Sequence, residues 1–185
     1  MKKTNKGFSL VELIIVIAIM AILAGAIAPA LIRYIDKSRK SNDVTASKTI
    51  KTAVETAMSN EETYELLTTG TEVTLTDLDS RPVKYAGYVV FDPGTATAGA
   101  GTGVTVNQAT GAVTPSTNGI ADAQKEIGKN VGEKIPKIKY KKAANDTNTP
   151  THFYAYCSAG GTVATGLGDG TNFYQLAPEV SKFYQ

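Results

Sequence analysis

Hydrophobic residues form one continuous stretch near the amino terminus. No charged or strongly polar side chain occurs in the twenty residues from Leu13 to Ile32. As a helix with about 1.5 Å rise per residue, this stretch spans the roughly 30 Å hydrocarbon core of a bilayer. Lys2, Lys3 and Lys6 precede it, and basic residues beside a first apolar segment hold that side in the cytoplasm. The pattern predicts a single-pass membrane helix with most of the chain outside.

Polar residues enter the pattern after Ile32, but the helical period continues to about Asn60. Apolar and small residues recur there at three- and four-residue steps. They are Ile35, Val44, Ser47, Ile50, Val54, Ala57 and Met58. We therefore predict one helix of roughly fifty residues, whose second half is amphipathic and lies on a globular domain.

From Glu61 onward the pattern becomes short and β-like. β-Branched and aromatic residues with turn residues between them indicate strands. The expected strands are Thr71–Leu75, Val83–Phe91, a hairpin of Val104–Val106 with Ala112–Thr114, His152–Cys157, and Asn172–Leu176 returning antiparallel. The fold class predicted is α+β, with the long amino-terminal helix packed on a carboxy-terminal antiparallel sheet.

The segments between these strands have other patterns. Thr95–Gly103 is rich in glycine, alanine and threonine and is expected to be an exposed loop. Ile120–Ile135 has a short helical period, and Lys137–Lys142 alternates so that Ile138 and Tyr140 face inward. The tail from Pro178 to Gln185 carries apolar residues that we expect to be packed.

Glu12 breaks the apolar pattern at its start. A carboxylate at the centre of a membrane helix costs about 2.5–3.5 kcal/mol, and less near an end, so it calls for a positively charged partner. The lysines precede Glu12 by six or more residues and do not supply one. A free amino group on Phe8 of a neighbouring subunit, released by cleavage of the Gly7–Phe8 bond, would do so.

The residues Lys-Gly-Phe-Ser-Leu-Val-Glu, from Lys6 to Glu12, precede the long apolar helix. This arrangement resembles the prepilin signature of type IV pilins and the related pseudopilins. The resemblance implies that a prepilin peptidase removes the leader after Gly7 and that Phe8 is then N-methylated. It also implies that Glu12 neutralises the amino group of an adjacent subunit during assembly. The resemblance covers about the first fifth of the chain.

The pilin fold that this resemblance implies divides the chain into four parts. These are a leader (1–7), a transmembrane and filament-core helix (8–32), the amphipathic half of that helix (33–60) and a β-rich head domain (61–185). The implied partners are copies of the same chain in a helical filament, prepilin peptidase, an assembly platform and a motor ATPase. The precursor would lie in the cytoplasmic membrane, and the assembled subunit in a surface pilus.

Several alternatives stay open. A pseudopilin of a type II secretion or competence system, or a minor pilin, has the same amino-terminal pattern. A secretory signal would need a shorter apolar run, and a plain membrane anchor leaves Glu12 unexplained. Adhesion, motility and DNA uptake are not separated by the sequence.

Gly25 and Pro29 mark the weakest turn of the apolar helix. Proline removes one backbone hydrogen bond and crowds the carbonyl four residues earlier, which here belongs to Gly25. A kink or local melting costs least at such a turn. The resemblance implies that this region is unwound in the assembled filament.

Charge and cysteine content narrow the class of protein. The formal net charge of the 185 residues is +2, and removal of Lys2, Lys3 and Lys6 leaves 16 basic against 17 acidic side chains. A nearly neutral mature chain is not a generally basic nucleic-acid binder. The single Cys157 cannot form an intramolecular disulfide. The chain therefore resembles the disulfide-free pilins of Gram-positive bacteria.

The sequence contains no residue set typical of an enzyme. With one histidine, His152, and one cysteine, neither a transition-metal site nor a catalytic triad is expected, and no cofactor is predicted. We read two glycine-rich runs as loops because they lack phosphate-binding spacing. They are Gly99-x-Gly101-x-Gly103 and Gly166-x-Gly168-x-Gly170. The oxygen-bearing groups Asn145, Asp146 and Asn148, and Asp169 with Asn172, fit no specific calcium loop.

Lysines gather in one segment of the chain. Lys137, Lys139 and Lys141 would share one face of a strand. Such a face is either the solvated side of an edge strand, where lysines block unwanted pairing, or a surface that binds DNA or another polyanion.

Overall fold

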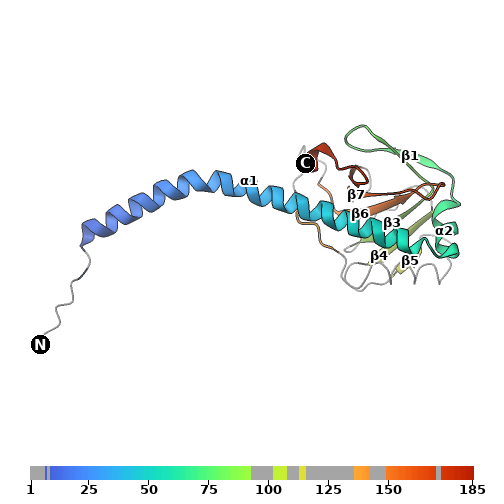
Figure 1. Ribbon diagram of the computed structural model, residues 1–185, viewed down its shortest axis with the longest axis horizontal. Coiled ribbons are helices and arrows are strands. Elements are labelled where there is room, and N and C mark those ends of the chain that lie inside the picture. The colour runs from blue at the N-terminus through green and yellow to red at the C-terminus, as the bar shows by residue number, and fades with distance from the viewer. Residues whose placement is uncertain are drawn as a thin grey trace, which may run out of the picture. The chain divides into compact units, whose positions relative to one another are not determined.

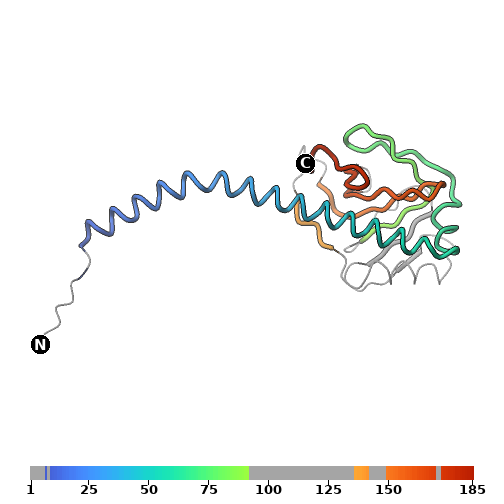
Figure 2. Tube along the Cα trace, in the orientation of Figure 1, coloured from blue at the N-terminus to red at the C-terminus, as the bar shows by residue number. Residues whose placement is uncertain are grey.

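A computed structural model describes residues 7, 9–92, 102–107, 113–115, 136–141, 149–169 and 172–185 (Figures 1 and 2). The chain divides into two units, Met1–Ser38 and Arg39–Gln185. Helix α1, Leu10–Ala57, is 48 residues long and contributes to both units. The predicted long helix is therefore confirmed.

In the first unit, the large apolar side chains of α1 are exposed. Leu10, Ile22 and Tyr34 are each 73% exposed, and none of the apolar window of the helix is buried within the chain. The helix is long and apolar enough to cross a membrane. Its surface is thus one that lipid or another protein can cover but that water does not favour.

In the second unit, α1 buries one stripe. Asp43, Ser47, Ile50, Val54 and Ala57 are buried at steps of three and four residues, which confirms the predicted amphipathic face. Ile35, which was expected on that face, lies in the first unit and stays 37% exposed.

A second helix was missed by the sequence analysis. Helix α2, Glu61–Thr68, follows α1 after a short turn. The side chain of Asn60 caps it by accepting hydrogen bonds from the amides of Glu62 and Thr63. Its signal was an Asn followed by acidic residues, which is typical of a helix start.

The second unit contains two sheets. β1 (Val73–Thr76) and β2 (Pro82–Tyr85) form an antiparallel hairpin. The larger sheet has the order β5-β4-β3-β6-β7-β8. Its strands are β3 (Gly87–Asp92), β4 (Thr102–Asn107), β5 (Val113–Pro115), β6 (His152–Cys157), β7 (Val163–Gly168) and β8 (Phe173–Ala177). All pairs are antiparallel except β3 with β4. The α+β class and the β4–β5 hairpin are confirmed.

In the large sheet, β3, β6, β7 and β8 carry packed side chains on both faces. On one face, side chains such as Phe91 and Phe153 pack with Ile50 and Val54 of α1, which lies across the sheet in Figure 1. On the other face, a second cluster joins the sheet to the β2 strand. It contains Tyr88, Val90, Tyr154, Tyr156 and Phe173 with Val83 and Tyr85. Burial on two sides explains why β3 and β6 have few polar residues.

The prediction of one strand over Val83–Phe91 is wrong. The segment is divided at Ala86 between β2 and β3, which lie in different sheets. The amide of Ala86 donates to Cys157 O at 2.7 Å. Gly87 lies so close to α2 that an added Cβ would be 2.5 Å from Leu67 O. The contact with α2, which the strand pattern does not contain, favours the break.

The prediction that Gly166 and Gly168 lie in a loop is also wrong. Both belong to β7, which is the strand that returns beside β6, and β8 pairs with β7. A Cβ on Gly166 would be 2.0 Å from Tyr174 O, and one on Gly168 would be 2.5 Å from Asn172 O. Glycine is needed here for the close approach of two backbones.

The lysine segment has the predicted alternation without being a strand. Residues 136–141 have no regular secondary structure, but Tyr140 is buried while Lys137, Lys139 and Lys141 are exposed. Other sequence predictions lie outside the described residues: the Gly99 and Gly101 part of the Thr95–Gly103 loop, the Ile120–Ile135 helix, Asn145, Asp146, Asn148 and Lys142.

Candidate functional site

Glu12 lies in the first turn of α1 and is exposed. Its Oε2 accepts a hydrogen bond of 2.9 Å from the backbone amide of Ser9. The first amides of a helix lack intrahelical acceptors, and the helix dipole favours negative charge at this end. Because a carboxylate has about four acceptor positions, the contact with Ser9 leaves capacity for another donor.

The predicted cleavage site lies just before this turn. Gly7 is exposed, and no atom comes within 4 Å of a Cβ built on it. Phe8 lies outside the described residues. The structure therefore places Glu12 beside the helix start but does not describe the residue whose amino group was predicted to meet it.

Gly25 and Pro29 lie inside α1, and the helix is continuous through both. No atom comes within 4 Å of a Cβ built on Gly25. Pro29 has no amide hydrogen to donate to the carbonyl of Gly25, so this turn has one backbone hydrogen bond fewer than its neighbours. In this structure the weak turn is retained as helix.

Lys137, Lys139 and Lys141 lie on a segment that α1 holds in place. The buried carboxylate of Asp43 accepts hydrogen bonds from the amides of Lys139 and Tyr140, at 2.7 and 2.8 Å. The ammonium group of Lys40 lies over the Tyr140 ring, 5.1 Å from its centroid. The lysine side chains thus project from an anchored backbone.

Cys157, His152, Asp169 and Asn172 are the described residues among those considered for catalysis or metal binding. No group of three or more His, Cys, Asp or Glu side chains among the described residues could hold a metal ion. Burial raises the pKa of the Cys157 thiol to about 12, which keeps it protonated. His152 is buried in β6, and its Nδ1 lies 2.6 Å from the hydroxyl of Thr151. Asp169 accepts two hydrogen bonds from Asn172, which closes the turn between β7 and β8.

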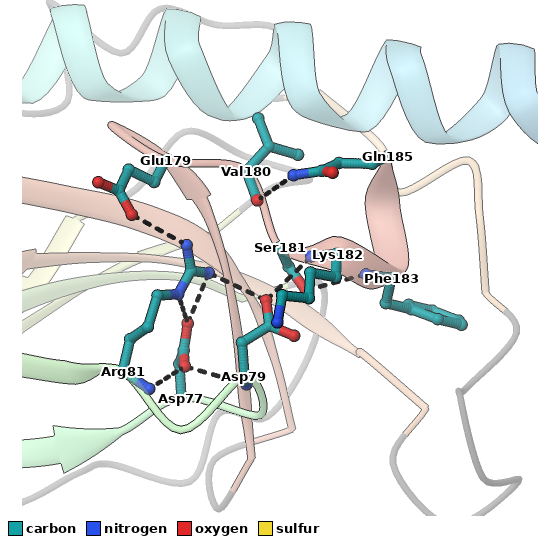
Figure 3. A network of polar contacts seen from close by, with 9 residues as sticks. All are labelled: Asp77, Asp79, Arg81, Glu179, Val180, Ser181, Lys182, Phe183 and Gln185. Carbon is teal, nitrogen blue, oxygen red and sulfur yellow. Dashed lines mark hydrogen bonds and ion pairs between the residues drawn. The ribbon is translucent and has the colours of Figure 1, made fainter.

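A network around Arg81 was missed by sequence reasoning (Figure 3). Asp77 is buried, and its Oδ1 accepts from the amides of Asp79 and Arg81, at 3.0 and 2.7 Å. The guanidinium of Arg81 contacts Asp77 at 2.7 Å, Asp79 at 3.2 Å and Glu179 at 3.4 Å. Asp79 also accepts from the amide of Lys182 at 2.9 Å. The acids at alternate positions in Asp77-Leu78-Asp79 signalled the turn, but the contacts with Glu179 and Lys182 had no local signal.

The Arg81 network borders a hollow of about 460 Å³ beside the carboxy-terminal segment. That segment contains the short 3₁₀ helix η1, Lys182–Tyr184. A second hollow, of about 530 Å³, lies between the β1–β2 hairpin and the large sheet and includes Glu72, Lys84 and Gln175. Neither hollow contains a nucleophile paired with a base.

Comparison with known proteins agrees with the amino-terminal features. The family described as the prokaryotic N-terminal methylation motif matches residues 2–28. Two type IV major fimbrial proteins FimA of Dichelobacter nodosus are each 41% identical to this chain over 58 residues. The match covers 31% of this chain and 37% or 36% of the fimbrial proteins. The chain thus spans little more than a third of the length of these curated relatives.

No solved structure matches the chain. The matched residues include Lys2, Lys3, Lys6, Gly7 and Glu12 and continue into the apolar part of α1. In this motif and in the exposed apolar helix that contains most of it, the amino-terminal part of the chain is similar to type IV pilins.

Proposed function

We propose that this chain is the major structural subunit of a type IV pilus, cleaved after Gly7 and assembled through its amino-terminal helix. The observation that carries the proposal is the exposed apolar surface of α1, which has no charged residue between Glu12 and Arg33. In water this surface is unfavourable, and it is covered first by lipid and then by the helices of other copies. The methylation motif and the similarity to FimA support this order of events.

In the proposed filament, the amino group of Phe8 lies against Glu12 of an adjacent subunit. Support comes from the position of Glu12, whose carboxylate is directed to the start of its helix by the Ser9 amide. An ion pair among apolar helices is favourable only when both charges are compensated. The pairing thereby favours one axial register between neighbouring helices.

We propose the division of the chain into four parts that the sequence pattern predicts. Residues 1–7 are the leader, 8–32 the membrane and filament-core helix, 33–60 its amphipathic half and 61–185 the head domain. Within the core helix, we propose that the turn from Gly25 to Pro29 melts when the subunit leaves the bilayer. The missing hydrogen bond at Pro29 lowers the cost of that change.

The proposed partners are prepilin peptidase, which cleaves and methylates, an assembly platform, a motor ATPase and other copies of this chain. The precursor is a single-pass protein of the cytoplasmic membrane, and the assembled subunit is displayed on the cell surface. Adhesion, motility and DNA uptake are all compatible with this role. A pseudopilin of a secretion or competence system, or a minor pilin, is the alternative assignment, and a Gram-positive source stays a prediction.

The intact mass of the polypeptide in material sheared from the cell surface tests the proposal. We expect the mass of Phe8–Gln185 plus one methyl group. The processed form found only in membranes would instead favour a pseudopilin. An unprocessed mass would contradict the proposal and favour a plain membrane anchor.

We also propose that Lys137, Lys139 and Lys141 bind a polyanion such as DNA on the pilus surface. The observation in favour is that all three are exposed while Asp43 accepts hydrogen bonds from the amides of Lys139 and Tyr140 in the same segment. An anchored row of cations loses less conformational freedom on binding phosphates than a free one does.

A further inference from the structure

The two edges of the large sheet are protected in different ways. The edge strand β5 has three residues and ends at Pro115, and short strands and prolines both discourage pairing with another chain. The edge strand β8 has the sequence Phe-Tyr-Gln-Leu-Ala, with no charge and no proline. Such a strand accepts a further strand readily when its outer side is open.

Two separate segments cover the outer side of β8. The amide of Leu78, from the turn between β1 and β2, donates to Phe173 O at 2.9 Å. The amide of Ser181, from the carboxy-terminal segment, donates to Gln175 O at 2.8 Å. The alternate carbonyls at Phe173 and Gln175 are the groups that an additional strand would use.

Asp79 joins these two covering segments. It lies next to Leu78, and its Oδ2 accepts from the amide of Lys182, next to Ser181, at 2.9 Å. The same oxygen lies 3.2 Å from Arg81, which also reaches Glu179 (Figure 3). The Asp79 carboxylate thus joins the two segments that cover the outer side of β8.

The far end of the carboxy-terminal segment is held independently. The ammonium group of Lys40 donates to Phe183 O and lies 4.6 Å from the centroid of the Phe183 ring. Tyr184 is buried, and its ring lies 6.0 Å from that of Tyr140. Loss of the Asp79 contact would therefore open the β8 edge while the end of the segment stays attached.

We propose that Asp79 and Arg81 form an edge clip, which fastens the carboxy-terminal segment over β8 and so prevents a second copy of this chain from adding a strand there. The partner excluded is another β8, because an antiparallel pair of identical edges would satisfy the carbonyls of Phe173 and Gln175 on both copies. The clip goes beyond the role proposed for α1, since it controls association through the second unit.

The experiment uses the full-length chain in detergent micelles. Asp79→Ala removes the joining carboxylate, and Glu72→Ala is the matched control, because Glu72 precedes the same hairpin and pairs with Lys84 at 3.7 Å. Hydrogen exchange measures the amides of Leu78 and Ser181, and light scattering after size exclusion measures the mass at increasing protein concentration. For Asp79→Ala we expect exchange at both amides to be at least about tenfold faster and the mass to double. The control should match the wild type.

A second pair of variants tests the same contact without changing Asp79. Lys182→Pro removes the amide hydrogen that Asp79 accepts, whereas Lys182→Ala keeps it. Proline is tolerated at the first residue of a helix, and Ser181 already has the extended backbone that a following proline requires, with φ −55° and ψ 140°. Only the proline variant should show faster exchange and dimers.

Unchanged exchange at Leu78 and Ser181 in both Asp79→Ala and Lys182→Pro would overturn the clip. If the amides of Leu78 and Ser181 exchange faster in these variants but the protein stays a monomer at every concentration, the proposal that an open β8 edge pairs with a second copy would be overturned. Neither result depends on whether the chain forms pili, because the test concerns the second unit alone.

Discussion

Asp43 on α1 accepts a hydrogen bond from the backbone amide of Tyr140, which is 97 residues later in the chain, at 2.8 Å. A side-chain carboxylate of the long helix thereby accepts backbone hydrogen bonds from the lysine segment, as a neighbouring strand would in a sheet. The amide of Lys139 donates to the other oxygen at 2.7 Å.

Replacing Asp43 with Ala should destabilise the second unit by about 3 kcal/mol, because the amides of Lys139 and Tyr140 would lose their acceptor in a buried site. Pulse proteolysis of the full-length protein in urea measures this change. Thr45→Ala is the control, since Thr45 is exposed on the same helix and its hydroxyl donates to the backbone oxygen of Ser41, one turn earlier. A loss of stability no larger than that of the control would contradict the role of Asp43.

The stability contributed by Asp43 should depend on pH. Burial raises the pKa of the Asp43 carboxyl above its usual value of 3.8, although the amides of Lys139 and Tyr140 and the charge of Lys139 oppose the shift. Between the unfolded and folded pKa values, the folded chain binds more protons, so the free energy of unfolding falls as pH rises. This proton-linked part of the stability is complete below the unfolded pKa and is lost above the folded one, whereas the hydrogen bonds from the amides of Lys139 and Tyr140 remain.

We therefore expect the wild type to lose stability relative to Asp43→Asn as pH rises from about 3 towards neutrality. Urea midpoints of the two proteins at a series of pH values give the difference. A difference that is constant with pH, or that favours the wild type as pH rises, would show that burial does not raise the pKa of the Asp43 carboxyl.

Gly166→Ala should destabilise the chain by about 3 kcal/mol or more, because backbone overpacking cannot be relieved by a rotamer change. The added Cβ would lie 2.0 Å from Tyr174 O and 2.8 Å from the Phe173 ring. Gly160→Ala is the matched control, since its nearest neighbour would be Ser158 Oγ at 3.8 Å. The urea midpoint should move for the first variant only. Equal midpoints would mean that β7 and β8 separate easily.

Glu12→Ala should leave membrane insertion intact and reduce incorporation into filaments by about a hundredfold. This estimate takes the cost of an unpaired charge among apolar helices as about 2.5–3.5 kcal/mol. The ratio of sheared to membrane-bound subunit on immunoblots measures incorporation. Normal filaments from this variant would refute the pairing with Phe8.

Glu12→Gln separates the two roles of that side chain. Glutamine keeps an acceptor for the Ser9 amide but has no charge for the amino group of Phe8. If charge pairing governs assembly, this variant should fail as Glu12→Ala does. Assembly at the wild-type level would instead assign Glu12 to capping α1.

Exchange of Lys137, Lys139 and Lys141 for Gln should reduce the salt dependence of DNA binding by purified pili. Three phosphate contacts contribute a slope of about −2.7 in log affinity against log salt. Lys48, Lys51 and Lys84 changed to Gln together form the control, with the same loss of charge. If the slope of log affinity against log salt is equal in the two triple variants, the lysine segment does not bind DNA.

The sequence analysis predicted best the elements that a single segment determines. α1 was predicted because its apolar run and its later period of three and four residues need no knowledge of the partner. Glu12 was singled out because one acid in an apolar run is costly wherever the helix lies.

Elements that depend on distant contacts were missed. Gly166 lies in β7 because Tyr174 approaches it, and the break at Ala86 depends on Leu67 and Cys157. A glycine-rich segment has the local pattern of a loop until the neighbouring strand is known. The contact of Arg81 with Glu179 joins residues 98 apart in sequence, so the edge clip could be found only in three dimensions.

The tyrosines of the second unit lie close enough together to give a near-ultraviolet circular dichroism signal. The chain has nine tyrosines and no tryptophan, and Tyr34 is the one that precedes Arg39. Tyr154 and Tyr156 stack with ring planes 4° apart and centroids at 5.7 Å, and Tyr85 lies 4.6 Å from Tyr156. Electronic transitions of phenols at such distances couple, which gives the folded unit a circular dichroism signal near 280 nm. This signal would therefore report whether the second unit is folded, without any added label.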